Sequence, residues 1–545
     1  MGTNNRYGVK EKLRIKLIAP PVPFTYPDNV FVMPPYGLGI VVAQLKACNF
    51  DVSVDDLFAD ELKNRLIPGR KFKINFKAAR KNEKRIWDFL IDGRESAVVD
   101  SLAERLIRPI KFNNEDVFGI TVFSHNHLIP ALLIAKKIKQ RFNKITVLGG
   151  AYITYCDAYF LKLFDFVDYM IEGDGPSFLK LLYFIENTGD MSKVPGLFYR
   201  ADSDILKVSK EASFSMNNIP IPYFDEASLD IYRGLFSHKK LILPYQISSG
   251  CCNRCNFCPV PQEGSISFKS HTKVLSDLRA MTARYNTDLI YFCDSNIAFS
   301  GDYLRKLCLE IEDNKLNIRW ASYAAFDNLD FSLLSKMYKS GCRTLLLGVE
   351  TGSAPLRKAM GKACDISHVT KVLKASAAAG IKNIVSFITG YPHEKSEDIS
   401  HTVNFIRENR DFIFLAGSYP FAVRNRSPIF NFPEKYDIRI YNSDEDKEEF
   451  KRRMLRAGKS YEFDEIGALA WKDKTRQQRL SDNMVMKNIY RSVIAGKFIR
   501  RLIPFRVYKA LRSRFFNPGL LSGLVSRIAL KPKALNIFAD NNAAR

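Results

Sequence analysis

The chain has 545 residues and a formal net charge of +24, with 46% hydrophobic and 26% charged residues. This length is too great for one hydrophobic core, so we expect two or three domains, and the composition excludes a disordered chain. The apolar runs are too short for a membrane-spanning helix, and charges interrupt the N-terminus where a signal peptide would be apolar. Ten cysteines without a paired pattern favour a reducing compartment, so we expect a cytoplasmic protein.

The first part of the chain alternates between predicted strands and helices. Short apolar strands are predicted at 13–19, 51–55, 117–123, 145–150 and 168–172, and helices at 37–47 and 128–142. This alternation is typical of an α/β fold with a Rossmann-like, doubly wound parallel sheet and ligand sites at the carboxyl ends of its strands. We place this domain at 1–190, with a basic helical insertion at about 62–112.

The alternation resumes after a proline-containing linker at 191–238. Strands are predicted at 241–247, 289–293, 318–323, 343–349 and 384–389, each followed or preceded by a helix. Repeated strand–helix units predict a (βα) barrel, and we expect an open, partial (βα)6 barrel at 239–430. Chemistry in such barrels gathers at the carboxyl ends of the strands.

Three cysteines follow the first predicted barrel strand. Cys251, Cys255 and Cys258 lie in SSGCCNRCNFCPVP, and this spacing lets one short loop point three thiolates at one object. Three thiolates leave a four-coordinate zinc site incomplete, and the next histidine downstream is His271. They are enough for three irons of a 4Fe–4S cube, whose fourth iron then stays open to another ligand.

The cysteine spacing, with Phe257 before the last cysteine, resembles the signature of the radical S-adenosylmethionine (radical SAM) superfamily. The resemblance covers about residues 241–421. It implies a 4Fe–4S cluster held by the three cysteines, with S-adenosylmethionine bound at the open iron beside Phe257. It also implies reductive cleavage of S-adenosylmethionine to a 5′-deoxyadenosyl radical.

Further barrel residues stand where this superfamily binds its cofactor. Asp294 in YFCDSN matches a position that accepts a hydrogen bond from the methionine amine, and Glu350 in LLLGVETGS matches one that binds the amino-acid or ribose end. Gly390 and Tyr391 in FITGYPHE are expected beside the adenine. A helix cap or turn remains the alternative for Asp294, and a purely structural role remains the alternative for Glu350.

The first domain resembles the cobalamin-binding domain that precedes this core in one large subgroup. The matching segments are MPPYGLGIVVAQLKA, TVFSHN, LGGAYIT and IEGDGPSFLKLL. The resemblance implies that cobalamin contacts these segments, through Pro35, Gly37, Ser124, Gly149, Gly150, Glu172 and Gly173. The chain has no D-x-H-x-x-G sequence, so we expect no histidine on cobalt, and we expect His125 and His127 in a surface loop. A fold used only for packing or substrate binding is the alternative.

The C-terminal region, 431–545, is predicted to be basic and mostly helical. Its last 95 residues hold 22 Lys or Arg against 6 Asp or Glu, and the stretch 487–516 is amphipathic. Peripheral contact with the inner membrane face is one interpretation, and a helix packed back on the barrel is the other. No nucleic-acid-binding motif occurs among the basic residues, so we do not expect nucleic acid as a partner.

Together, the two resemblances imply a cobalamin-dependent radical SAM enzyme that methylates an unactivated carbon. The substrate class stays open between a small molecule, a peptide and a lipid, and an electron donor such as flavodoxin or ferredoxin is expected. Ring closure or oxidation without methyl transfer is the alternative within the superfamily. A non-catalytic basic binding protein is the alternative outside it.

Overall fold

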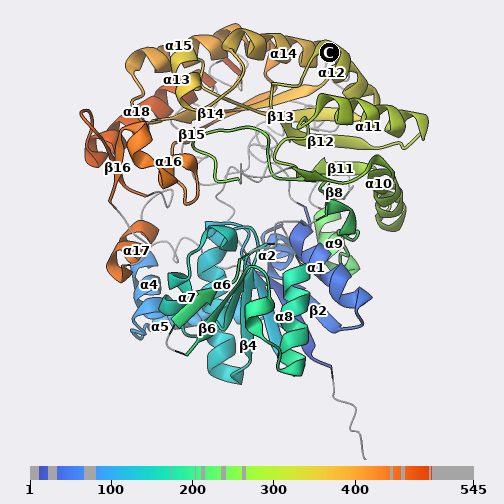
Figure 1. Cartoon of the computed structure of the whole chain (residues 1–545), viewed down its shortest axis with the longest axis vertical. Coiled ribbons are helices and arrows are strands. Elements are labelled where there is room, and N and C mark those ends of the chain that lie inside the picture. Colours follow the sequence, from blue (N-terminus) through green and yellow to red (C-terminus); the bar gives the residue numbers. More distant parts are fainter. Residues whose placement is uncertain are drawn as a thin grey trace, which may run out of the picture.

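A computed structural model describes residues 12–21, 33–66, 82–173, 175–202, 204–209, 215–234, 241–260, 266–441, 446–455, 461–489 and 492–493. These residues form two α/β bodies that face each other, and C-terminal elements lie on both of them (Figure 1). The carboxyl-end loops of each body point toward the other.

The first domain is built on a seven-stranded sheet with the order β2-β1-β3-β4-β5-β6-β7. Its strands are β1 (Arg14–Ala19), β2 (Asp51–Asp56), β3 (Val117–Thr121), β4 (Ile145–Gly149), β5 (Tyr169–Ile171), β6 (Leu197–Ala201) and β7 (Asp204–Lys207). The first five strands pair in parallel, and β6 and β7 are antiparallel. The order reverses at β1, as in a doubly wound fold, so the predicted Rossmann-like sheet is confirmed.

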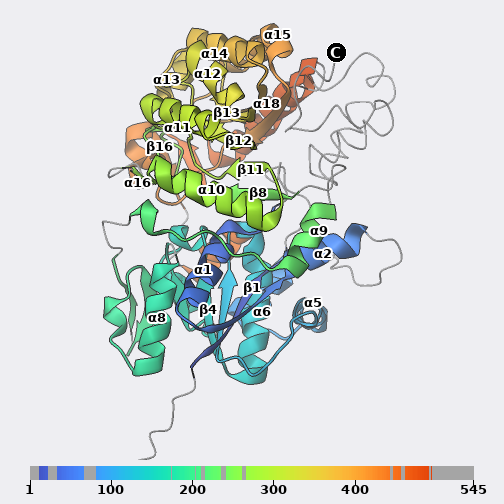
Figure 2. The same cartoon turned by 90° about the vertical axis from the view of Figure 1, so that its right-hand side faces the viewer.

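The linker predicted at 191–238 is wrong over its first part, because β6 and β7 lie within it. Leu197 and Phe198 are fully buried, so this short hairpin extends the first sheet instead of leaving it. The chain then forms α9 (Glu226–Gly234), which lies beside α2 (Leu57–Leu66) between the two bodies (Figure 2). Tyr232 of α9 donates a hydrogen bond to Asp56 at 2.7 Å, and burial raises the pKa of that carboxyl to about 6.

Helices cover both faces of the first sheet. One face packs against α4 (Glu83–Ile91), α5 (Ala97–Ile107) and α6 (His125–Phe142), and the other against α1 (Tyr36–Ala47) and α8 (Pro176–Asn187). In α4, Ile86, Phe89 and Leu90 recur at helical spacing and are buried, which directs this helix onto the sheet. The helices α2, α4 and α5 occupy much of the segment predicted as a helical insertion.

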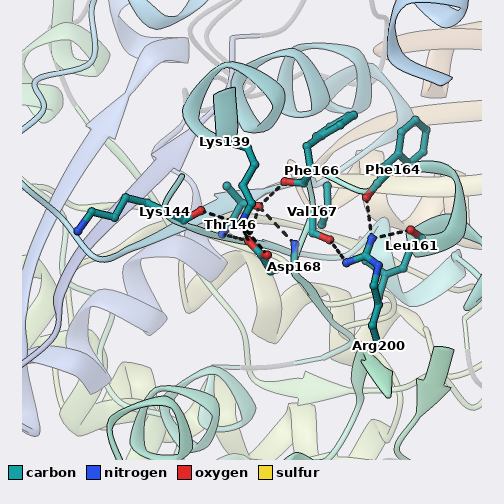
Figure 3. Close-up of polar contacts among 9 residues, drawn as sticks. All are labelled: Lys139, Lys144, Thr146, Leu161, Phe164, Phe166, Val167, Asp168 and Arg200. Carbon is teal, nitrogen blue, oxygen red and sulfur yellow. Dashed lines mark hydrogen bonds and ion pairs between the residues drawn. The ribbon is translucent and has the colours of Figure 1, made fainter. Parts of the chain in front are cut away.

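Two polar clusters fasten the middle of this sheet (Figure 3). Asp168 accepts hydrogen bonds from Lys139 of α6 at 2.8 Å and from the Thr146 main-chain nitrogen of β4 at 2.8 Å. Arg200 of β6 donates to the main-chain oxygens of Leu161, Phe164 and Val167. These carbonyls lie at and after the end of α7 (Tyr159–Leu163), where helical partners are lacking. The contacts therefore hold the chain between β4 and β5 in place.

The second domain is a six-stranded sheet with the order β15-β14-β13-β12-β11-β8. Its strands are β8 (Ile242–Tyr245), β11 (Leu289–Phe292), β12 (Arg319–Ala324), β13 (Cys342–Glu350), β14 (Lys382–Thr389) and β15 (Leu415–Pro420), all paired in parallel. Its main helices are α10 (His271–Tyr285), α11 (Gly301–Asp313), α12 (Phe331–Lys339), α14 (Ile366–Ala378) and α15 (Ser396–Glu408). A sequential parallel order with the strands open at both edges confirms the partial (βα)6 barrel.

The C-terminal region adds elements to both domains. It contains α16 (Pro428–Asn431), the antiparallel pair β16 (Ile438–Ile440) and β17 (Phe463–Glu465), α17 (Lys447–Met454) and α18 (Trp471–Ile489). The helix α18 packs on α15 and β15, whereas Phe450 of α17 packs against Trp87 in the first domain. Most of the amphipathic stretch 487–516 lies outside the described residues. No helix in the described ranges has the length and apolar character needed to cross a membrane.

Candidate active site

The cysteine loop leaves the barrel at the carboxyl end of β8, after the short strand β9 (Ser248–Ser249). Gly250 adopts a φ of +94°, which a residue with a side chain rarely adopts, and this turns the chain into the loop. The Cys258 main-chain nitrogen donates to the Cys255 oxygen at 3.1 Å, which folds the last two cysteines into one turn. Asn256 donates from its main-chain nitrogen to Met360 at 3.0 Å and so fixes the loop to the barrel.

The three loop thiols lie close enough to influence one another. Burial raises the pKa of Cys251 and Cys255, and raises that of Cys258 to about 11, and the charges of Cys251 and Cys255 add to the rise at Cys258. Soft thiolates on one loop fit an iron–sulfur cluster, and iron binding would release their protons. In the described part of the chain, no three acidic, histidine or cysteine side chains converge on one metal ion. The three thiolates of a cube bind three different irons, and three cysteines on one loop are the donor set that such a cube requires.

Asp294 braces the chain that leads to this loop. It is fully buried after β11, and its carboxylate accepts hydrogen bonds from the Ile247 main-chain nitrogen at 3.1 Å and from Ser248 Oγ at 2.6 Å. Burial raises its pKa to about 6 although these donors oppose the rise. Both oxygens are therefore engaged inside the fold, and the predicted contact with a methionine amine stays a prediction.

Glu350 ends β13 in a conformation that is unusual for a residue with a side chain. Its φ is +65°, and the pairing of β13 with β14 shifts register between Gly348 and Glu350. The Lys362 ammonium lies 3.2 Å from Glu350 Oε1 and 3.4 Å from the Gly348 oxygen. The backbone at Glu350 is strained, so this ion pair helps to hold a carboxylate at the predicted position beside the loop.

Lys362 is a site residue that the sequence reasoning missed. Besides Glu350, it interacts with Cys255 through a hydrogen bond, and its ammonium lies 5.6 Å from the centre of the Phe257 ring. Burial would lower the pKa of Lys362, but the charges of Glu350 and Cys255 outweigh this effect and raise it. A lysine in the otherwise mostly apolar run KAMGKAC was the available signal.

Gly390 and Tyr391 are covered by other parts of the chain. A Cβ at Gly390 would lie 2.0 Å from Gln478 Cγ of α18, so the glycine allows that helix to approach. Tyr391 is buried, and its hydroxyl donates to the Ala359 oxygen at 3.1 Å. These contacts show packing roles for both residues, and their predicted place beside an adenine stays a prediction.

The edge of the first sheet leaves open space at several predicted cofactor residues. No atom lies within 4 Å of a Cβ built on Gly37 or Gly149. Gly150 and Gly173 have φ values of +107° and +109°, which glycine adopts without strain. Pro35 is the residue that precedes α1. The backbone at Gly37 and Gly149 can therefore be approached closely by a large ligand, which fits the bound group that the resemblance implies.

Ser124 begins α6 through a reciprocal cap with His127. Ser124 Oγ lies 3.1 Å from His127 Nδ1, and the Ser124 main-chain nitrogen lies 3.3 Å from the same atom. Burial lowers the pKa of His127 to about 4, so the ring is neutral at pH 7. The surface loop predicted for His125 and His127 is wrong, because both residues lie in the first turn of this helix.

Glu172 links the two domains. It is 4% exposed, and its carboxylate pairs with Lys207 at 2.7 Å and with Arg426, which follows β15 of the barrel. Burial would raise the pKa of Glu172, but hydrogen bonds from Arg426 and Lys207 outweigh it and hold the pKa below its usual value. The side chain therefore has two protein partners, and the predicted contact of this residue with cobalamin stays a prediction.

A cavity of about 310 Å³ lies between the first-domain edge and the cysteine loop. Ser124 and Tyr152 line it from the ends of β3 and β4, and Pro259, next to Cys258, lines it from the loop. Aromatic and basic side chains complete it, among them Phe123, Tyr155, Tyr159, Phe160, Arg424, Phe450, Arg453 and Tyr461. The residues that follow β3 and β4 and a residue of the cysteine loop, far apart in the sequence, therefore meet at one cavity.

Residues 245–406 match the family model of the radical SAM superfamily. This part of the chain is a radical SAM domain. The fold of the chain is similar to that of TsrM, a radical S-adenosylmethionine methyltransferase from Kitasatospora setae with cobalamin and a 4Fe–4S cluster bound. That match has a TM-score of 0.64 and 15% identity, over 96% of this chain and 99% of that one. The match to OxsB, a cobalamin-dependent S-adenosylmethionine radical enzyme, has a TM-score of 0.63 and 15% identity, over 96% of this chain and 74% of that one.

Curated relatives match this chain over shorter stretches. An uncharacterized methyltransferase of Pyrococcus horikoshii is 23% identical over 57% of this chain and 69% of its own length. An anaerobic magnesium-protoporphyrin IX monomethyl ester cyclase of Synechocystis is 22% identical over 47% of this chain. The chain spans about half of that cyclase, 52% of its length. The comparisons therefore show a radical SAM domain at residues 245–406 and a fold shared with TsrM and OxsB.

Proposed function

We propose that this chain is a cobalamin-dependent radical SAM enzyme that methylates an unactivated carbon of its substrate. The observation that carries the proposal is the shared cavity, because the cysteine loop and the carboxyl edge of the Rossmann-like sheet both line it. Solved proteins of the same fold, named as cobalamin-dependent radical SAM enzymes, support it.

The proposed roles follow from the donor groups at each side of the cavity. Cys251, Cys255 and Cys258 would hold a 4Fe–4S cluster, and the open backbone at Gly37 and Gly149 would lie against cobalamin. When bound, these groups supply the electron that cleaves S-adenosylmethionine and the methyl group that is transferred. The chain would supply a braced loop and a cavity in which the two groups meet the substrate.

A second candidate reaction is ring closure or oxidation without methyl transfer. Two of the curated relatives are named as anaerobic magnesium-protoporphyrin IX monomethyl ester cyclases, at 22% and 21% identity. The two reactions differ in the fate of the methyl group. A substrate that gains 14 mass units, about one CH₂ group, indicates methylation, and a loss of hydrogen indicates closure or oxidation.

The partners follow from the proposed chemistry. The enzyme would take electrons one at a time from a small donor such as flavodoxin or ferredoxin, and it would act in the reducing cytoplasm that its cysteine usage favours. The substrate class stays open between a small molecule, a peptide and a lipid. The intact cysteine triplet disfavours a non-catalytic binding protein.

The test is anaerobic reconstitution of the whole chain with iron, sulfide and cobalamin, followed by dithionite and S-adenosylmethionine. We expect bound iron, a changed cobalamin absorption spectrum, and formation of 5′-deoxyadenosine and S-adenosylhomocysteine. Cys252→Ala is the matched control, because this neighbouring thiol is exposed. Reconstituted protein that binds no iron would exclude a radical SAM reaction, and iron without bound cobalamin would exclude the methyl-transfer assignment.

A further inference from the structure

Lys362 lies where the cysteine loop meets the end of β13. Its ammonium contacts Glu350 Oε1 at 3.2 Å, donates to the Gly348 oxygen, and forms a hydrogen bond with Cys255. The lysine side chain is 17% exposed, so water and salt screen its charge only weakly. One positive charge is therefore held against the loop by three separate partners.

The same ammonium lies 5.6 Å from the centre of the Phe257 ring, which stands between Cys255 and Cys258 in the loop. A positive charge at this place stabilises negative charge on the groups that the loop holds. The other charges that act on Cys255 are the carboxylates of Glu350 and Asp327, which have the opposite effect. Lys362 is thus placed to compensate negative charge that gathers at the centre of the loop.

We propose that Lys362 is a positioning residue that raises the reduction potential of the cluster held on Cys251, Cys255 and Cys258. Reduction adds one electron from an external donor and leaves the cluster with one more negative charge. The nearby ammonium stabilises that product more than the oxidised cluster, so the electron is accepted more readily. The inference rests on the proposed function, because it requires the cysteine loop to hold the cluster.

The test is a potentiometric titration of the reconstituted whole chain without S-adenosylmethionine or cobalamin, in which electron paramagnetic resonance measures the reduced cluster. For Lys362→Met, we expect the ratio of reduced to oxidised cluster at a fixed potential to fall about tenfold. That change equals a shift of about 59 mV for one electron. Lys362→Arg keeps the charge and is expected to stay within about twofold of the unaltered protein.

Two further variants separate charge from simple loss of structure. Lys358→Met removes an equal charge from an exposed position on the preceding helix α13 (Ala354–Ala359), and no change is expected. Glu350→Gln removes the opposing charge, so the potential is expected to move in the positive direction. A purely structural role for Lys362 would not produce shifts of opposite sign in Lys362→Met and Glu350→Gln.

The possible outcomes decide the inference separately from the proposed function. If the unaltered chain binds no cluster, the proposed function fails and takes this inference with it. If the unaltered chain binds a cluster and Lys362→Met has the same potential, the inference alone is overturned. If Lys362→Met does not retain iron, Glu350→Gln tests the inference instead. An unchanged or more negative reduction potential in Glu350→Gln would then overturn the inference.

Discussion

The barrel and the first domain differ at the ends of their strands. The barrel buries the carboxylate that follows β11, whereas the first domain leaves the glycine backbone at the end of β4 open. The Asp294 carboxylate accepts hydrogen bonds from Ile247 and Ser248, and these contacts position the cysteine loop. Gly149, at the end of β4, has no atom within 4 Å of a Cβ position. The barrel thus fixes the loop that carries the three cysteines, and the first domain leaves a surface that a large ligand can cover.

The largest effect is expected from removing one ligand on the barrel side. Cys255→Ala leaves two thiolates on the loop, which cannot hold a cube with one open iron. We expect loss of the bound cluster and a fall in 5′-deoxyadenosine formation to the level without protein. Iron analysis and chromatography of the reaction check this, and full turnover in Cys255→Ala would contradict it.

The sequence was sufficient to predict the open (βα)6 barrel and the cysteine loop, because both rest on local patterns. It was not sufficient to predict the partners of the strand-end residues. Asp294 meets Ser248 across 46 positions, Gln478 meets Gly390 across 88, and Arg426 meets Glu172 across 254. Such contacts depend on tertiary packing, so three predicted cofactor residues have structural tasks that no local pattern indicates.

The strand β15 shows a second limit of local patterns. Its sequence LAGSYP contains no Val, Ile or Thr, the β-branched residues that favour strands. It pairs with β14 along its whole length and packs against α18, so tertiary contacts determine its conformation. The barrel was expected to have six strands, but only five could be placed from the sequence.

Asp294→Asn tests whether this buried carboxylate supports the cysteine loop. The amide would turn an N–H group toward donors that now meet a carboxylate, which leaves a buried group unsatisfied. We expect a loss of about 2 kcal/mol in the free energy of unfolding and weaker retention of iron. Urea unfolding of the apo chain measures the first effect. Asp302→Asn, at an exposed position in α11, is the control, and equal stability of the two variants would contradict the bracing role.

Glu172→Gln tests the link between the two sides. Arg426 and Lys207 would each lose a charged partner, so we expect about 1–2 kcal/mol less stability at pH 7. The pKa of Glu172 is held low in the folded chain, so its contribution is present above the pKa of the unfolded chain and is lost as the pH falls through the folded value. The difference between the variant and the unaltered chain should therefore shrink toward pH 3, about one unit below an unperturbed glutamate pKa. A difference that does not change with pH would contradict this ion pair.

Gly149→Ala tests the exposed backbone of the other side, with the smallest effect on folding. The added methyl group meets no protein atom, so the free energy of unfolding should change by less than about 0.5 kcal/mol. Cobalamin that lies on this backbone would be displaced, and we expect its affinity to fall about tenfold. Titration followed by absorbance measures the affinity. Unchanged affinity would remove Gly149 from the cobalamin surface.

Electron paramagnetic resonance can measure whether the cluster and the cobalamin lie close together, in protein that holds both a reduced cluster and Co(II) cobalamin. Both centres would carry an unpaired electron, and the proposal places them on either side of the cavity that Ser124, Tyr152 and Pro259 line. The predicted result is magnetic coupling that broadens both signals relative to chain loaded with either group alone. Two undisturbed spectra from the doubly loaded chain would contradict the proposal that the cysteine loop and the first-domain edge form one active site.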